Sequence, residues 1–317
     1  MTVLLLGSRV KYQPIVVQLV QSSIDFVIYD AEKGLPNQCK ELESYTTFVG
    51  YENFFEPDFY KQKHSHIDKI INLRDQATWI KLEQDLCEVF DTKQRFDNTT
   101  RDFFGSKAKQ DQICKQLDIP TLGNSKNKII VKKDQGVSGG TDFYITSKSD
   151  YKPDKNDFVQ DWAEIDRVFS VQFYADYNNN WHLLSTMCGI YEDNCPVTFN
   201  TPVDIRKDIL YYMKQLKTKI NTTGRIMFWQ FIKPVDDDCI YNMDFNCRPA
   251  GGFENGSYDF DVSDCNWSNI LLTDNVPTHI NYHSSIQIDY NIKQTFGYSS
   301  YQRTKKQLQK KQEVIVI

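Results

Sequence analysis

Apolar and polar residues at the start of the chain follow the pattern of an α/β lobe. Residues 3–7 read VLLLG, a continuous apolar run of strand length that ends in glycine. A stretch with helical spacing, Gln13 to Ser22, separates it from a second apolar run, Phe26 to Asp30, which ends in an acid. The same lobe continues with two short strands and one helix: Tyr45 to Val49, Ile67 to Asn72 and residues 75–90.

This strand, glycine turn, helix and acid-ended strand resemble the start of a dinucleotide-binding unit. The first turn, however, reads Gly7-Ser8-Arg9 and lacks a GxGxxG run. We therefore interpret the region as an α/β lobe and expect no nicotinamide site. Residues 92–105 are polar and rich in turn formers, and we expect a lobe boundary there.

The middle of the chain reads as paired strands separated by turns. A strand at Ile129 to Lys132 enters a glycine-containing loop, and a second strand, Phe143 to Ile145, leaves it. Residues 157–175 give a strand, a short acidic break and another strand. Residues 203–220 carry apolar side chains at helical spacing and predict an amphipathic helix that packs against a sheet.

The strand Arg225 to Ile232 and the strand Ile240 to Asn246 flank the turn Asp236 to Asp238, which predicts a hairpin. Residues 302–312, QRTKKQLQKKQ, are basic and rich in glutamine, and we expect a solvated helix or tail. The last residues, Val314 to Ile317, suit an edge strand.

A polar group follows the second strand of that hairpin, in the run MDFNCRPAGGF from Met243 to Phe253. Residues two apart on a strand point to the same face, so Asp244, Asn246 and Arg248 project together. Paired strands would bring Gln230 to the same face. Mg²⁺ takes carboxylate oxygens together with substrate phosphates and water, and arginine donates to phosphate oxygens. An edge strand with a polar outer face explains the run equally well.

The loop after Lys132 contains four small residues: Gly136, Ser138, Gly139 and Gly140. Glycines let main-chain amides approach phosphate oxygens, and a lysine beside them adds a positive charge. The loop leads into a strand rather than a helix, so it is not a P-loop. A flexible hairpin is the alternative. Lys107, in the first turn of a helix that runs to Leu117, reads by itself as a solvated lysine.

Composition excludes several classes of protein. The 317 residues carry a net charge of -5, which argues against a nucleic-acid surface. The chain has no run of 18 apolar residues, so we expect no membrane-spanning helix. The N-terminus lacks the features of a signal peptide. The eight cysteines include no CxxC pair, so we expect neither a zinc site nor a disulfide framework, but reduced thiols in the cytoplasm. His182 reads as a structural histidine.

The order of these features resembles the ATP-grasp superfamily of carboxylate–amine ligases, and within it the carbamoyl phosphate synthetase-like branch. The matching residues span about 140 positions in the order Ser106-Lys107, Ile119-Pro120, Val131-Lys132 with the glycine loop, Val159-Gln160-Asp161-Trp162, Gln230, and Asp244, Asn246 and Arg248. No single motif is specific, but their shared order and spacing argue against coincidence. The resemblance covers about residues 1–270.

The resemblance implies an ATP-grasp fold with an N-terminal Rossmann-like lobe. Residues 1–100 would form that lobe, residues 101–160 the small lobe with the phosphate loop, and residues 161–317 the large lobe with the metal site and a C-terminal extension. ATP would lie between the last two lobes, with Mg²⁺, or Mn²⁺ in its place.

The resemblance also implies a role for each matching residue. Lys107 and Lys132 would contact the α- and β-phosphates, and Gly136, Ser138, Gly139 and Gly140 would cover the β- and γ-phosphates. Gln160, Asp161 and Trp162 would meet adenine. Gln230, Asp244 and Asn246 would hold the metal, and Arg248 would steady the transferring phosphoryl group.

The implied reaction activates a small carboxylate, such as an amino acid, as an acyl phosphate that an amine then attacks. Asp244 and Asp161 stand where the family commonly has Glu, and the ribose-binding acid has no assured match. A nucleotide-binding scaffold without ligase activity is therefore an alternative, and an acid kinase is a third reading. We expect small-molecule partners, no nucleic acid and no membrane, with a homodimer compatible with the family. Substrate contacts would lie in Tyr191 to Thr201 and Phe253 to Asp264.

Overall fold

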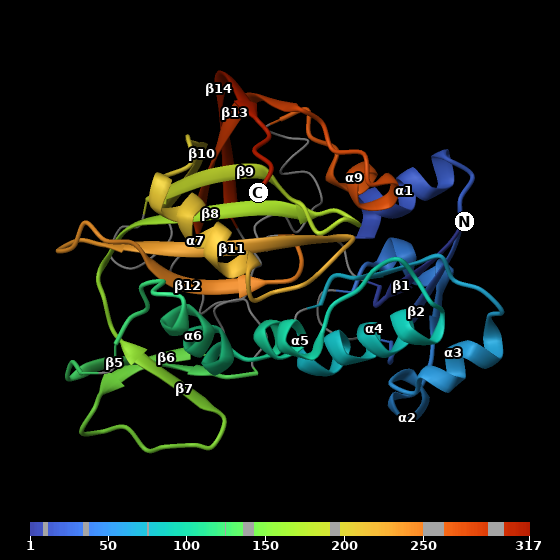
Figure 1. Ribbon diagram of the computed structural model, residues 1–317, viewed down its shortest axis with the longest axis horizontal. Coiled ribbons are helices and arrows are strands. Elements are labelled where there is room, and N and C mark those ends of the chain that lie inside the picture. The colour runs from blue at the N-terminus through green and yellow to red at the C-terminus, as the bar shows by residue number, and fades with distance from the viewer. Residues whose placement is uncertain are drawn as a thin grey trace.

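The computed structural model describes residues 1–8, 12–33, 38–74, 76–123, 125–135, 143–190, 197–249, 263–290 and 301–317. The described strands form three sheets of four, seven and three strands. The four-stranded sheet lies at the N-terminal end of the molecule, and the large sheet and the small sheet lie at the other end (Figure 1). The predicted mixed α/β fold is therefore confirmed.

The N-terminal sheet is parallel, with the order β3-β2-β1-β4, because each strand continues through a crossover rather than a tight turn. Its elements are β1 (Thr2–Leu6), α1 (Gln13–Gln21), β2 (Asp25–Asp30), η2 (Lys40–Tyr45), β3 (Thr46–Phe48), α2 (Tyr51–Phe54), α3 (Pro57–Lys63), β4 (Lys69–Asn72) and α4 (Ala77–Val89). Alternate residues of β1 pack on opposite faces: Leu5 belongs to the core under α1, and Leu4 to the core under α2 to α4.

The large sheet is built from antiparallel strands in the order β12-β11-β8-β9-β10-β13-β14. Its elements are β8 (Ile165–Ala175), β9 (Trp181–Ile190), β10 (Val197–Pro202), α7 (Lys207–Lys217), β11 (Arg225–Pro234), β12 (Tyr241–Asn246), α9 (Trp267–Thr273), β13 (His279–Tyr290) and β14 (Tyr301–Glu313). The predicted amphipathic helix is α7, whose apolar face, Ile209, Met213 and Leu216, is buried against the sheet.

The prediction for residues 302–312 was wrong, because they form β14 rather than a helix or tail. β14 pairs along its length with β13, from His279 opposite Glu313 to Tyr290 opposite Tyr301. Main-chain pairing with the preceding strand, β13, decides this structure, and local helix propensity does not. The last residues do join a strand edge as predicted: Val316 bridges His182, and the amide of Trp181 donates to Ile317.

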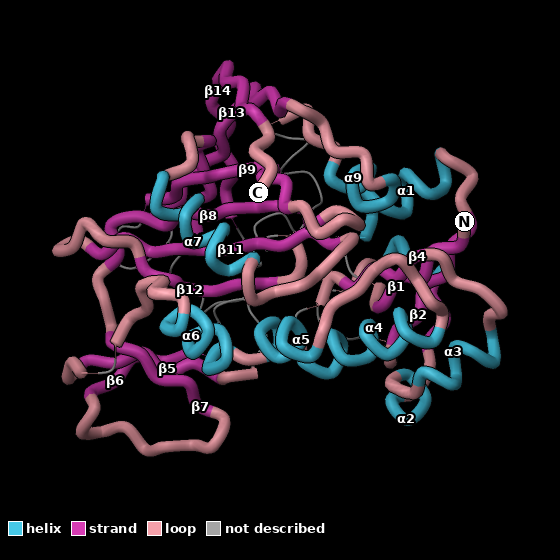
Figure 2. The backbone as a smooth tube through the Cα atoms, viewed as in Figure 1, coloured by secondary structure: helices cyan, strands magenta, loops and turns pink. Residues whose placement is uncertain are grey.

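The small sheet has the order β6-β5-β7 and consists of β5 (Lys128–Lys133), β6 (Phe143–Ser147) and β7 (Asp157–Asp161). Helices α4, α5 (Asn98–Gly105) and α6 (Lys107–Gln116) follow one another between the N-terminal lobe and this sheet (Figure 2). Residues 92–105 were expected to be turn-rich, but α5 occupies their second half. The Asp97 side chain caps it by accepting from the Thr100 amide.

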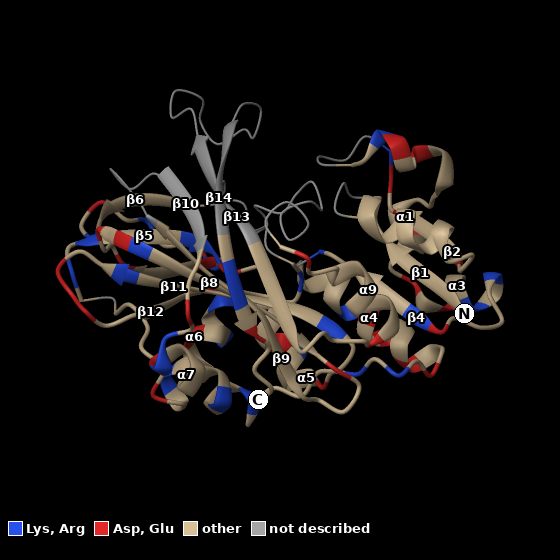
Figure 3. Cartoon of the chain, turned by 90° about the horizontal axis from the view of Figure 1, so that it is seen from above, with Lys and Arg blue, Asp and Glu red and all other residues tan. Residues whose placement is uncertain are grey.

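Lysine and arginine are interspersed with aspartate and glutamate at both ends of the folded molecule (Figure 3), in line with the small net charge. No helix within the described residues has the length and apolar character needed to cross a membrane.

Candidate active site

The edge strand β12 and its neighbour β11 hold the predicted metal-binding residues side by side. In the antiparallel register Gln230 lies opposite Asp244, and Phe228 lies opposite Asn246. The register shifts between Gln230 and Phe231: Gln230 pairs with Asp244, whereas Phe231 pairs with Asn242. The prediction that the hairpin places Gln230 beside Asp244 and Asn246 is confirmed.

The oxygen atoms of this group are largely uncommitted. The Asn246 side-chain amide donates to Asp244 Oδ2 at 2.9 Å, and the structure gives Asp244 no other side-chain hydrogen bond within the described residues. Across those residues no three His, Cys, Asp or Glu side chains gather in a way that could hold a metal. One carboxylate with two amides is instead a donor set that leaves most of a hard cation's coordination to phosphate and water.

Lys132, on β5 of the small sheet, lies close enough to Asp244 for the two charges to interact. Its Nζ donates to Gln160 Oε1 at 3.1 Å, and Gln160 is 2% exposed. Burial lowers the pKa of Lys132 to about 8, opposed by the nearby Asp244 carboxylate and reinforced by Lys107. The structure therefore brings together the lysines, the glutamine and the acid that the sequence singled out.

Lys107 begins α6, and its position is fixed by Asp134 at the entrance to the glycine loop. Ser106 Oγ donates to both oxygens of Asp134 at 2.9 Å, and the Ala108 amide donates to Asp134 Oδ1 at 2.7 Å. Ser106 Oγ in turn accepts from the Lys109 amide as the helix N-cap. The first turn of α6 and the end of β5 are therefore joined.

Gln110, one turn further along α6, was not a candidate from the sequence. Its Nε2 donates to the carbonyl of Phe245 at 2.8 Å, and its Oε1 accepts from the Phe245 amide at 3.2 Å. Phe245 lies between Asp244 and Asn246, and Gln110 is 4% exposed. A polar residue inside a helix ordinarily reads as solvated, so the sequence carries no signal for this contact.

Asp161 lies beside this group but directs its carboxylate elsewhere. Oδ1 accepts from the Lys126 amide at 2.7 Å, and Oδ2 from Ser125 Oγ at 3.4 Å. The amides of Asp161 and Trp162 donate to Gly123 and Lys128. Any nucleotide contact proposed for this hinge therefore falls to main-chain atoms other than these two amides, or to the Trp162 ring.

Arg248 follows the end of β12, is 7% exposed and donates from Nη1 to the Pro249 carbonyl at 3.0 Å. The intervening Cys247 is buried in the core of the large sheet, as strand alternation predicts. The loop residues Gly136, Ser138, Gly139 and Gly140 lie outside the described part of the chain. So do most of the two segments expected to contact the substrate.

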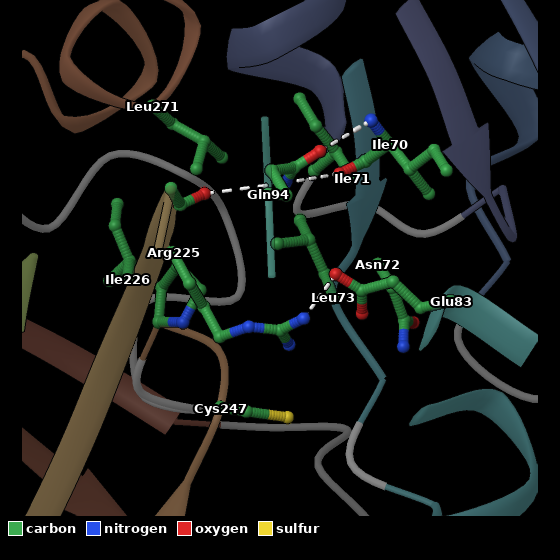
Figure 4. Close-up of a pocket in the computed structure, with 12 residues that line it drawn as sticks. Ile70, Ile71, Asn72, Leu73, Glu83, Gln94, Arg225, Ile226, Cys247 and Leu271 are labelled. Carbon is green, nitrogen blue, oxygen red and sulfur yellow. Dashed lines mark hydrogen bonds and ion pairs between the residues drawn. The ribbon is translucent and has the colours of Figure 1, made fainter. Parts of the chain in front are cut away.

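The N-terminal lobe and the large sheet meet beside the residues that follow β12. A small cavity there is lined by β4, α4, β11 and the residues Cys247 and Pro249 (Figure 4). Arg225 of β11 reaches across it to an ion pair with Glu83 of α4, and both side chains are at least 95% buried. The Arg225 guanidinium also lies 4.6 Å from the centre of the Phe96 ring. This pair ties the N-terminal lobe to the strand next to the site.

Solved structures show how this arrangement compares with known proteins. The N5-carboxyaminoimidazole synthetase of Staphylococcus aureus, complexed with ADP, is similar over 90% of this chain and 81% of its own, with a TM-score of 0.70 and 13% identity. The chain has the ATP-grasp fold. This fold is the one that the sequence resemblance implied.

Two further structures with the ATP-grasp fold are similar. The L-amino acid ligase of Bacillus licheniformis has a TM-score of 0.64 and 11% identity, and matches over 91% of this chain and 80% of its own. The carboxyaminoimidazole ribonucleotide synthase of Aspergillus clavatus, complexed with ATP, has a TM-score of 0.66 and 12% identity, and matches over 89% and 81%. No family model matches the chain, and no curated protein matches its sequence.

Proposed function

We propose that this ATP-grasp chain is an ATP-dependent carboxylate–amine ligase that activates a small carboxylate, such as an amino acid, as an acyl phosphate. The observation that carries the proposal is the grouping of Gln230, Asp244 and Asn246 in the hairpin, with Lys132 close enough to Asp244 for their charges to interact. Lys132 supplies positive charge for phosphates. Gln230, Asp244 and Asn246 supply oxygen ligands for a cation. The solved structures with this fold support the proposal, since two are named as complexes with ADP or ATP.

Mg²⁺ fits the donor set, because the Asp244 carboxylate has unused hydrogen-bonding capacity and the two amides offer neutral oxygens beside it. Gln230, Asp244 and Asn246 would hold the ion, and Mn²⁺ would be accepted by the same ligands. When bound, the ion neutralises the charge that develops on the transferring phosphoryl group.

The residues of the chain would bind and orient the two substrates. Lys107 and Lys132 would hold the α- and β-phosphates, the glycine loop would exclude water from the γ-phosphate, and Arg248 would steady the phosphoryl group in flight. Adenine would meet the hinge at Gln160 to Trp162. The acceptor carboxylate would then need only to lie in line with the γ-phosphorus.

The proposed reaction has two steps. A carboxylate oxygen attacks the γ-phosphorus, the bond to the β-phosphate oxygen breaks, and ADP leaves. The amine nitrogen then attacks the acyl carbon, the carbon–oxygen bond to phosphate breaks, and the nitrogen loses a proton as the amide forms. The products are an amide, ADP and phosphate.

Nucleotide turnover with Mg²⁺, ATP and pooled amino acids tests this proposal, provided that ADP and AMP are resolved. ADP release that depends on particular pools is the expected result, and dividing those pools would identify the acid and the amine. Lys132→Ala should remove most of this turnover while the protein stays folded. AMP as the product would overturn the acyl-phosphate route, and near-wild-type turnover in Lys132→Ala would overturn the site.

A second candidate function is nucleotide binding without ligation, as a binding or regulatory protein. The Asp161 carboxylate accepts hydrogen bonds from residues 125 and 126. This favours the second candidate, because the hinge then has no acid directed at the nucleotide. Tight ATP binding without ADP release in any pool would support this alternative.

A further inference from the structure

We propose that Gln110 is a positioning residue for the metal site: by holding the main chain of Phe245, it fixes where Asp244 and Asn246 present their oxygens. The inference rests on the proposed function, because the metal site is part of it. Gln110 contacts the main chain of Phe245, the residue between Asp244 and Asn246, rather than the side chain of either proposed ligand.

The first step of the argument is that β12 is an edge strand. Within the large sheet it pairs with β11 alone, and its outer edge meets the chain at Asn242, which bridges Thr121. The amide and carbonyl of Phe245 face away from the sheet beyond that bridge. Buried main-chain groups need partners. Gln110 supplies both, with its Nε2 and Oε1 at 2.8 and 3.2 Å.

The second step is that the Phe245 side chain is fixed as well. Its ring lies 5.0 Å from the ring of Phe103, 5.8 Å from that of Phe104 and 5.3 Å from that of Trp229, measured between centroids. Ring and main chain together leave this residue little freedom. The flanking Asp244 and Asn246 are therefore held on the opposite face of the strand.

The third step is that the same helix carries the other parts of the site. Lys107 lies one turn before Gln110, and Ser106 and Ala108 hold Asp134 at the entrance to the phosphate loop. Helix α6 thus connects the lysine, the loop entrance and the ligand strand in one rigid element. A glutamine at position 110 sets the distance between the phosphate side and the metal side.

The chain offers a matched control in Gln94. Its Oε1 accepts from the Ile70 amide and its Nε2 donates to the Ile70 carbonyl, both at 2.7 Å. Gln94 is 3% exposed and Ile70 lies on β4, the edge strand of the N-terminal sheet. The two glutamines make the same pair of contacts with an edge strand. Gln94 also donates to the Gly224 carbonyl at 3.3 Å, just before the start of β11, whereas Gln110 contacts the residue that lies directly between Asp244 and Asn246.

The experiment compares Gln110→Met and Gln94→Met with the wild-type protein. Binding of Mn²⁺ in the presence of β,γ-methylene ATP is measured from the electron paramagnetic resonance signal of free Mn²⁺. Binding of the same analogue in EDTA is measured by calorimetry. Melting temperatures report stability. Methionine keeps the length of glutamine and removes both hydrogen bonds.

We expect both substitutions to lower the melting temperature. Only Gln110→Met should weaken Mn²⁺ binding, by about tenfold, as losses of groups that orient metal ligands do. Its metal-free affinity for the analogue should stay within about twofold of the wild-type value, since the phosphate lysines are untouched. The Phe245 amide should exchange its hydrogen faster.

Equal Mn²⁺ affinity in Gln110→Met and the wild-type protein would overturn the inference. Weaker Mn²⁺ binding in Gln94→Met as well would also overturn it, because the effect would then be general loosening. If Gln110→Met does not fold, Gln110→Glu, which can still accept from the Phe245 amide, takes its place with the same expectations. Failure of the wild-type protein to bind Mn²⁺ with the analogue would instead overturn the proposed function.

Discussion

Asp30 and Asp244 both lie at or near the carboxyl end of a strand, and the chain treats the two acids differently. Asp30 ends β2 in the N-terminal sheet and is fully buried. Its oxygens accept from the Ser8 amide and hydroxyl, the Gln38 side chain and the Ala31 amide, all at 2.8 to 2.9 Å, and the Arg74 guanidinium lies 3.6 Å away. Asp244, on β12, accepts from Asn246 alone within the described residues.

The difference separates a structural acid from a candidate ligand. A carboxylate offers about four acceptor positions, and those of Asp30 are filled by the chain itself. Its crevice resembles a nucleotide site in sequence, yet it has no capacity left for a nucleotide. Asp244 keeps that capacity and faces a lysine whose charge burial makes costly. Unused hydrogen-bonding capacity, rather than strand-end position, marks the site.

Asp30→Asn should give the largest effect, and the effect should be on stability. The substitution replaces one acceptor oxygen by a donor that faces other donors, and leaves Arg74 without its carboxylate. We expect a loss of about 3–5 kcal/mol in the free energy of unfolding, measured by urea denaturation. A loss below about 1 kcal/mol would contradict the structural role assigned to Asp30.

Asp244→Asn, the same substitution at the other acid, should leave stability nearly unchanged and lower turnover. Loss of the carboxylate charge removes a stabilising group from the proposed phosphoryl-transfer site, with an expected fall of about 10²- to 10³-fold in kcat. Steady-state ADP release measures it, and urea denaturation is the control. A variant that is unstable but active would reverse the comparison between the two acids.

Raising the pH should lower activity as Lys132 loses its proton. Burial lowers the pKa of Lys132 to about 8, so kcat/KM for ATP should fall about tenfold per pH unit above that value. The unfolded chain binds this proton more tightly than the folded protein, so stability should rise with pH between about 8 and the ordinary pKa of lysine. In Lys132→Arg, which stays charged, both trends should disappear.

The smallest expected effect comes from removing the N-cap of α6, beside the proposed site, or the N-cap of α9. Ser106→Ala at α6 and Asn266→Ala at α9 each remove an N-cap, with an expected loss of about 1 kcal/mol in the free energy of unfolding. Only Ser106→Ala also takes a donor from Asp134, so only this variant should raise KM for ATP. A raised KM in Asn266→Ala would show that cap loss alone disturbs the site.

The sequence predicted the parts of the site that follow from local pattern. Alternation along β12 placed Asp244 and Asn246 on one face, and the hairpin turn at Asp236 to Asp238 placed Gln230 beside them. Both inferences use only strand period and turn chemistry, which short stretches of sequence carry.

The sequence could not predict features that depend on tertiary pairing rather than on local pattern. Strand β14 has the composition of a solvated helix, and only pairing with β13 makes it a strand. Gln110 reads as a surface glutamine until the strand 135 residues later is placed beside it. The filled state of Asp30 likewise depends on Ser8, Gln38 and Arg74, three residues that no local pattern connects with one another.

Trp229, on the strand that carries Gln230, is an intrinsic fluorophore. Its indole is fully buried, donates to Asn242 Oδ1 at 2.7 Å and lies next to Gln230 in the chain. Trp229 packs with Phe245 on the face of the hairpin opposite Gln230 and Asp244. Indole emission responds to the packing and hydrogen bonding around the ring, so a shift of β11 or β12 on cation binding reaches a built-in fluorophore. We expect metal titrations to be readable from the change in tryptophan emission without any added dye.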